Sequence, residues 1–140
     1  AWLIDRGCKV LDDPELTQKM HVITKDLTAQ IYKVAFDGHS LANECDRGVV
    51  NVHRVWWVQA ETVIGFLNDY EKEPEKTEYL EAAEKEWAFI RDHVIDKRPG
   101  SEWFWEVDPE GNPYPGRPIV EPWKCPYHNG RMCMEVMKRC

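Results

Sequence analysis

The fold class of this chain follows from residues 13 to 38, DPELTQKMHVITKDLTAQIYKVAFDG. Asp13 is a typical N-cap, and Pro14 takes the first helical position, where its missing N–H costs no hydrogen bond. Apolar residues then recur every three or four positions until Asp37-Gly38, where a helix would end. This spacing predicts a long helix with one buried face. The face comprises Leu16, Met20, Ile23, Leu27, Ile31 and Val34.

Two further helices are predicted downstream. One runs from about Val55 to Tyr70 and the other from about Glu75 to Ile95, and each carries an apolar stripe at helical spacing. The opposite face of the second helix is a Glu/Lys surface that we expect to be solvated. The inward residues would be Trp56, Ala60, Val63, Leu67 and Tyr70 on the first helix, and Leu80, Ala83, Trp87, Ile90 and Val94 on the second.

The remaining segments complete an all-α pattern. Residues 3 to 11 begin without a capping residue, as if a helix had been entered partway, and the spacing of Cys133, Val136, Met137 and Cys140 predicts a last helix. Long connections at 38–54 and 96–122 separate the helices, and residues 101–107 alternate toward a short strand. This order predicts helical hairpins around a shared axis, with site-forming loops and a small hairpin at one end.

Composition excludes several classes of partner. The chain has 140 residues and a formal net charge of -7, with 25 acidic against 18 basic residues, which disfavours binding to a phosphate backbone. No stretch approaches the roughly 18 apolar residues that a membrane helix needs. The five cysteines are scattered without paired spacing, which favours reduced thiols. We therefore expect a soluble, cytoplasmic protein that binds neither nucleic acid nor membrane.

The segment WKCPYHNGR, residues 123 to 131, is the first candidate for chemistry. Pro126 places His128 at or just before the first turn of the last helix, where one ring nitrogen can project into a cavity and act as a general acid or base. The alternative is a capping histidine beside a packed tryptophan. A zinc site at Cys125, His128 and Cys133, with Cys45 as a fourth ligand, is disfavoured because structural zinc sites usually show two short ligand pairs. We expect no metal, and small packing roles for Cys125 and Cys133.

The segment WWVQAE, residues 56 to 61, is the second candidate. Trp57 and Glu61 are four residues apart and share a helix face, so an indole lies next to a carboxylate, a combination suited to a sugar ring and its hydroxyls. Only one of Trp56 and Trp57 can point fully inward. The alternative is a core tryptophan with a surface glutamate.

These two segments, with Glu102-Trp103-Phe104-Trp105 between them, resemble in order and spacing the C-terminal part of the cellobiose 2-epimerases. Those enzymes belong to the N-acylglucosamine 2-epimerase superfamily. The resemblance implies an (α/α)6 barrel that epimerises C2 of the reducing-end sugar of a β-linked disaccharide such as cellobiose, without metal or nucleotide cofactor. Two histidines on opposite faces of C2 would exchange its proton through an enediolate.

The resemblance assigns roles residue by residue. His128 matches the C-terminal histidine of that pair, and Trp2, Trp57, Glu61 and Trp123 match positions that line the sugar site. The other histidine belongs to a His-Asp-x-Glu motif just upstream of the position of Trp2. We therefore expect residues 1–140 to form a single domain that is the C-terminal fragment of a larger barrel. Alone, it would be inactive and would tend to self-associate.

Three alternative functions remain open at this stage. One is N-acylglucosamine 2-epimerase activity, so that the substrate would be an amino sugar rather than a disaccharide. Another is an inverting glycoside hydrolase, which would need Glu61 and Glu102 about 6.5–9.5 Å apart. The third is a sugar-binding fragment without catalysis. The other histidines, in helices or loops, are expected to be structural or solvated; these are His21, His39, His53 and His93.

Overall fold

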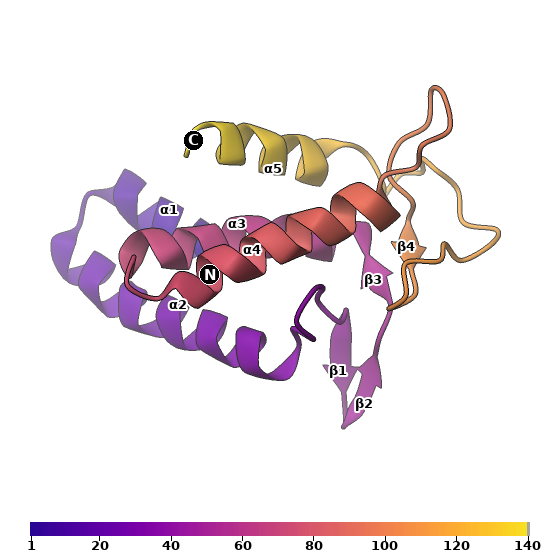
Figure 1. Ribbon diagram of the computed structural model, residues 1–140. Helices are drawn as coiled ribbons and strands as arrows, with labels where there is room; N and C mark the ends of the chain where they lie inside the picture. Colours follow the sequence, from indigo (N-terminus) through magenta and orange to yellow (C-terminus); the bar gives the residue numbers. More distant parts are fainter. Residues whose placement is uncertain (140) are drawn as a thin grey trace.

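The structure is a computed structural model that describes residues 1–139, with helices on one side and short strands gathered at one end (Figure 1). The helices are α1 (Trp2–Leu11), α2 (Pro14–Val34), α3 (Trp56–Lys72), α4 (Thr77–Phe89), the π-helix η1 (Ile90–Val94) and α5 (Tyr127–Met137). The strands are β1 (Glu44–Asp46), β2 (Val49–Asn51), β3 (Arg54–Val55) and β4 (Glu106–Val107). Cys140, which was assigned to the last helix, lies outside the described residues.

The predicted helices are confirmed, and their ends follow local chemistry. Asp13 caps α2 by accepting a hydrogen bond from the backbone N–H of Leu16 at 3.0 Å, with Pro14 in the first turn. The predicted stripe of α3 packs into the core, and Trp56 is only 1% exposed. The helix predicted to reach Ile95 is α4 followed by the wider turn of η1.

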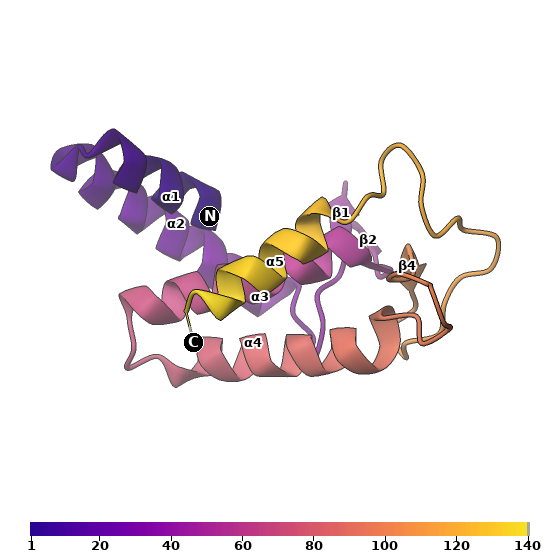
Figure 2. The same cartoon turned by 90° about the horizontal axis from the view of Figure 1, so that it is seen from above.

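Helices α1, α3 and α5 run in the same direction. Trp2 in α1 contacts Glu61 in α3, whereas Asp5, further along α1, contacts Lys72 near the end of α3. On α5, the early Arg131 likewise contacts Glu61, and α5 then continues alongside α3. Figure 2 shows the three helices beginning on the side nearer the strands and running away from it. Their N-terminal ends therefore converge at one end, as expected for the inner helices of a hairpin barrel.

The prediction of a buried apolar face on α2 is wrong. Leu16 and Met20 are only half-buried, and the other four predicted core residues are exposed: Ile23, Leu27, Ile31 and Val34. The side chains of α2 that are buried are Thr24 and Thr28. Periodicity identifies which face of a helix is apolar, but it does not say which element covers that face. Among the described residues, α1 and α3 pack on the threonine side instead.

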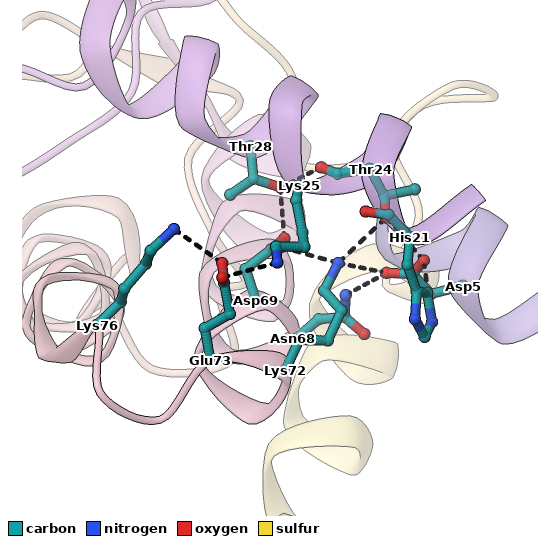
Figure 3. Close-up of polar contacts among 10 residues, drawn as sticks. All are labelled: Asp5, His21, Thr24, Lys25, Thr28, Asn68, Asp69, Lys72, Glu73 and Lys76. Carbon is teal, nitrogen blue, oxygen red and sulfur yellow. Dashed lines mark hydrogen bonds and ion pairs between the residues drawn. The ribbon is translucent and has the colours of Figure 1, made fainter. Parts of the chain in front are cut away.

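A polar network fills this contact between α1, α2 and α3 (Figure 3). Asp5 accepts hydrogen bonds from Thr24 at 2.8 Å, Asn68 at 2.6 Å and Lys72 at 2.8 Å. Lys72 also lies 2.8 Å from Asp69, whose carboxylate accepts a hydrogen bond from Thr28. Asp5 and Asp69 are both almost fully buried. One ammonium therefore neutralises two buried carboxylates, an arrangement that fixes α1 against α3.

We expect the 140-residue chain to self-associate through the apolar face of α2, because contiguous apolar patches are rarely left uncovered on soluble monomers. Light scattering should report species larger than a monomer at high concentration. Replacing both Leu27 and Ile31, which are 44% and 40% exposed, with glutamate should shift the distribution to monomer. A wild-type chain that stays monomeric across the accessible concentration range would contradict this expectation.

The short strands differ from the prediction made for residues 101–107. Only Glu106–Val107 forms a strand, β4, and it pairs antiparallel with β3 rather than within a local hairpin. Phe104 instead donates its backbone N–H to Val94 at 2.8 Å, so the preceding residues follow the end of η1. The hairpin lies in the other long connection, as β1 and β2. The β3–β4 pair ties both connections to the start of α3.

The buried face of α4 is rotated from the predicted one. Ala83 is buried as predicted, as are Ile90 and Val94 in η1, but Leu80 is half-buried and Trp87 is 38% exposed. Leu80 and Trp87 line an apolar groove of about 490 Å³ between α3, α4 and α5. The buried positions of α4 are Tyr79, Ala82, Ala83, Glu86 and Phe89. A glutamate therefore occupies a position that the apolar pattern had not marked as core.

Glu86 is fully buried, and neither of its carboxylate oxygens has a hydrogen-bond partner. Burial raises the pKa of Glu86 well above its ordinary value, partly offset by the charge of Arg54. The folded state therefore binds the carboxyl proton of Glu86 more tightly than the unfolded state does. The stability that this proton contributes is present in full below the unfolded pKa near 4.5 and is lost as pH rises through the folded pKa.

Glu86→Gln should consequently stabilise the chain at pH 8 by on the order of 1–3 kcal/mol, because the amide has no charge to desolvate. The difference should shrink toward zero at pH 4, where both side chains are neutral. Urea unfolding at the two pH values measures this. A variant that is less stable than wild type at pH 8 would show that the carboxylate is ionised and paired in the folded state.

Candidate functional site

His128 lies in the first turn of α5, directly after Tyr127 and the N-cap Pro126. Its side chain is 16% exposed, and its Nδ1 lies 2.7 Å from Oε1 of Glu61 on α3. Aromatic rings surround the imidazole: Trp56 and Trp57 lie 5.3 and 5.6 Å away between centroids. Two segments separated by 67 residues therefore meet at this imidazole.

Glu61 is the centre of the cluster. Its Oε2 accepts a hydrogen bond from the indole N–H of Trp2 at 2.7 Å, and its Oε1 accepts one from Arg131 at 2.5 Å in addition to the contact with His128. Burial tends to raise the pKa of Glu61, but hydrogen bonds from His128, Arg131 and Trp2 outweigh it and hold the pKa below its ordinary value. The carboxylate is therefore ionised at neutral pH.

An ionised Glu61 determines the tautomer of the imidazole. A carboxylate only accepts hydrogen bonds, so Nδ1 of neutral His128 carries the proton and Nε2 keeps its lone pair. Arg131 lies 3.1 Å from the same Nδ1 and is also a donor, so its hydrogen bond goes to Glu61. This arrangement resembles the oriented histidine of a general base, with Nε2 left for a substrate proton.

A cavity of about 330 Å³ adjoins the cluster and is lined by Trp2, Trp57 and Glu61. Trp57 is 43% exposed while Trp56 is buried, which confirms that only one of the pair points fully inward. His128 contacts two of the lining residues, Glu61 and Trp57, but is not itself among the residues that line the cavity. Indole faces beside hydrogen-bonding groups suit a sugar ring.

Trp123 does not join this group of contacts. Its side chain is 82% exposed, in a turn closed by backbone hydrogen bonds between Glu121 and Lys124. The structure thus brings together Trp2, Trp57, Glu61 and His128, and leaves Trp123 outside the residues that line the cavity. A larger cavity of about 980 Å³ lies against η1 and the 96–122 connection and contains none of these residues.

Two features of the site, the contact of Arg131 with Glu61 and a second polar group beside it, were not predicted from the sequence. The position of Arg131 could have been read from its spacing, because it lies three residues after His128 on one helix face. Glu102, Lys124 and Asn129 form the second group, in which Glu102 contacts both of the other side chains. Nothing in their sequence spacing predicts this contact across the 96–122 connection.

The remaining candidate ligands are separated or otherwise engaged. Among residues 1–139, no three His, Cys, Asp or Glu side chains are grouped so that they could hold a metal ion. Cys133, expected as a packing residue, is exposed. His53 lies 3.0 Å from Glu106 and stacks on Tyr114, which fits the structural role expected of it.

The parallel helices, whose N-terminal ends converge on one cluster of side chains, are the arrangement of a helical-hairpin barrel. Residues 11–129 match the family described as N-acylglucosamine 2-epimerase (GlcNAc 2-epimerase). The chain belongs to this family.

Curated relatives and solved structures are consistent with this family. The chain is 51% identical over 138 residues to the cellobiose 2-epimerase of Eubacterium cellulosolvens and 46% identical over 139 residues to that of Dictyoglomus turgidum, covering 99% of this chain in both cases. It spans 34% and 35% of the length of those two relatives.

A sugar epimerase from a ruminal bacterium superposes with a TM-score of 0.95 at 43% identity, and the cellobiose 2-epimerase of Bacillus thermoamylovorans with 0.87 at 41%. Each match covers 99% of this chain and 35% of the solved chain. These matches confirm the predicted fold class, part of an (α/α)6 barrel with short β-hairpin loops at the site end.

Proposed function

We propose that this chain supplies one half of the active site of a carbohydrate 2-epimerase that acts on the reducing-end sugar of a β-linked disaccharide such as cellobiose. The observation that carries the proposal is the imidazole of His128, held by an ionised Glu61 between two indoles. A neutral, oriented imidazole is the group required to remove a proton next to a carbonyl.

This geometry supports the following reaction. Once the sugar ring has opened, Nε2 of His128 takes the proton from C2, and the C–H electron pair moves into an enediolate whose charge forms on the carbonyl oxygen. A second acid on the opposite face then returns a proton to C2 and inverts its configuration. This second group is proposed to lie in the part of the barrel that the present chain does not contain. Trp2 and Trp57 would hold the sugar, with Trp123 at the mouth.

The hydrolase alternative is disfavoured by the bonding of its two carboxylates. A general acid must carry a proton at neutral pH, but hydrogen bonds from three donors lower the pKa of Glu61 despite its burial. Glu102 is engaged by Lys124 and Asn129. Neither carboxylate is placed as the acid of an inverting pair. Action on an N-acylated amino sugar remains the second candidate, because the family as a whole is described by that substrate.

The unit is proposed to be a single domain over residues 1–140, part of a barrel about three times as long. Within the described residues no helix is long and apolar enough to cross a membrane. Cys8, Cys45, Cys125 and Cys133 are all unpaired, which supports a reducing, cytoplasmic setting.

A chimaera tests the function. Residues 1–140 would replace the matching segment of the Eubacterium cellulosolvens enzyme, to which they are 51% identical. Incubation with cellobiose should give the C2 epimer, in which the reducing-end glucose has become mannose. Release of glucose would favour the hydrolase, and conversion of N-acetylglucosamine but not cellobiose would favour the amino-sugar alternative. Binding without conversion of either sugar would reject catalysis.

A further inference from the structure

One carboxylate links the 96–122 connection to both sides of His128. Oε2 of Glu102 contacts Nζ of Lys124, and Oε1 contacts Nδ2 of Asn129. Lys124 is 1% exposed and Asn129 is 7% exposed, so both donors are buried. The ammonium of Lys124 also donates to the carbonyl of Ile119 at 2.8 Å. Buried donors of this kind fix their partners in one geometry, because leaving either unbonded is costly.

The positions of the two donors matter for the site. Lys124 precedes His128 by four residues and Asn129 follows it by one, so holding both determines where α5 begins. Lys124 also closes the turn that carries Trp123, through backbone hydrogen bonds with Glu121 at 2.9 and 3.2 Å.

The buried ring of Trp56 lies against both Lys124 and His128. Nζ of Lys124 lies 5.3 Å from the ring centroid of Trp56, and the edge-on imidazole of His128 lies 5.3 Å from the same ring. Trp56 is thus in contact with both Lys124 and the proposed base, His128. Cation–π contact with a buried indole adds to the rigidity of this layer.

We propose that Glu102 is a positioning residue for His128 and Trp123: its carboxylate clamps the turn 121–124 and the first turn of α5 in the register that the site needs. This role rests on the proposed epimerase function. Glu102 acts through Lys124 and Asn129, because both of its oxygens are occupied by these donors. The position of His128 must be held closely, since a displacement of about 1 Å at a reacting group costs on the order of 100-fold in rate.

The decisive variant removes the clamp without leaving a buried charge unpaired. Glu102→Met combined with Lys124→Met replaces the ion pair with apolar side chains of similar length, which folded proteins often tolerate. In the chimaera, the melting temperature should stay within about 5 °C of the parent, and kcat should fall by about 10–100-fold while KM changes less than about threefold. Arg98→Met is the control, because Arg98 pairs with the buried Asp96 in the same connection. It should leave kcat unchanged.

A double variant with the kcat of the parent chimaera would overturn the proposal and reduce Glu102 to charge compensation for Lys124.

A second measurement, of hydrogen exchange, does not depend on activity. In the 140-residue chain, the amide of Gly130 donates to the carbonyl of Pro126 at 2.9 Å, and its hydrogen exchange should be at least about tenfold faster in the double variant. Unchanged exchange would also overturn the clamp. An inactive parent chimaera with faster exchange would instead reject the epimerase function and retain the clamp.

Discussion

Replacing His128 with asparagine in the chimaera is expected to slow exchange of the C2 proton of cellobiose by about 10²–10⁴-fold, the usual cost of losing one general acid or base. Sugar binding should stay within about tenfold, because the indoles of Trp2 and Trp57 remain. Asparagine keeps a polar group near Glu61 but has no ring nitrogen that accepts a proton. The measurement is the loss of the C2 proton signal in deuterated water, followed by NMR.

The matched control is His39→Asn, which removes an imidazole that is 51% exposed beside Asp37. Its exchange rate should equal that of the parent. Exchange in the His128 variant within tenfold of the parent would remove His128 from the mechanism, and the contact with Glu61 would then be only structural.

Replacing Lys72 with methionine is expected to lower the free energy of unfolding of the chain at pH 7 by about 3–5 kcal/mol, the cost of breaking a buried ion pair from one side. The side chain of Lys72 is 14% exposed, and its ammonium lies 2.8 Å from both Asp5 and Asp69. Without it, two buried carboxylates face each other with no cation. Urea denaturation measures the difference.

The stability lost in Lys72→Met should depend on pH in a definite direction. Burial tends to raise the pKa of Asp5, but hydrogen bonds led by Lys72 and Asn68 hold it below its ordinary value. Its stabilising contribution is therefore present above the unfolded pKa near 3.8 and is lost as pH falls through the folded pKa. The gap between wild type and variant should therefore narrow only as the pH falls below about 4.

Lys25→Met is the control, because Lys25 pairs with Glu73 at 2.7 Å but is 38% exposed. It should cost less than about 1 kcal/mol. Equal losses from Lys25→Met and Lys72→Met would show that the network between α1, α2 and α3 is no more than a surface ion pair.

The parts of this structure that were predictable from sequence depend on neighbours along the chain. The start of α2 follows from Asp13 and Pro14, and the pairing of Trp57 with Glu61 on one face follows from a four-residue spacing. His128 could be placed at a helix start by the proline two residues before it. Each of these features is determined within about one helical turn.

The missed features depend on partners distant in the chain. The apolar residues of α2 form one face as predicted, yet Val34 is 74% exposed because the described helices pack on the threonine side. Strand β4 pairs with β3, about fifty residues earlier, instead of with an adjacent strand. Glu102 was considered only as a hydrolase carboxylate, since its contacts with Lys124 and Asn129 appear only after the long connection folds back.

The orientation of His128 is the most direct test of this account. Long-range ¹⁵N–¹H spectra of the 140-residue chain with labelled histidine, assigned against His128→Asn, report which ring nitrogen carries the proton in the neutral imidazole. With Glu61 ionised and 2.7 Å from Nδ1, the proton should be on Nδ1 and Nε2 should be bare, ready to accept a proton from C2. A proton on Nε2, with Nδ1 bare, would contradict the account, because His128 would then have no free base to present to a sugar.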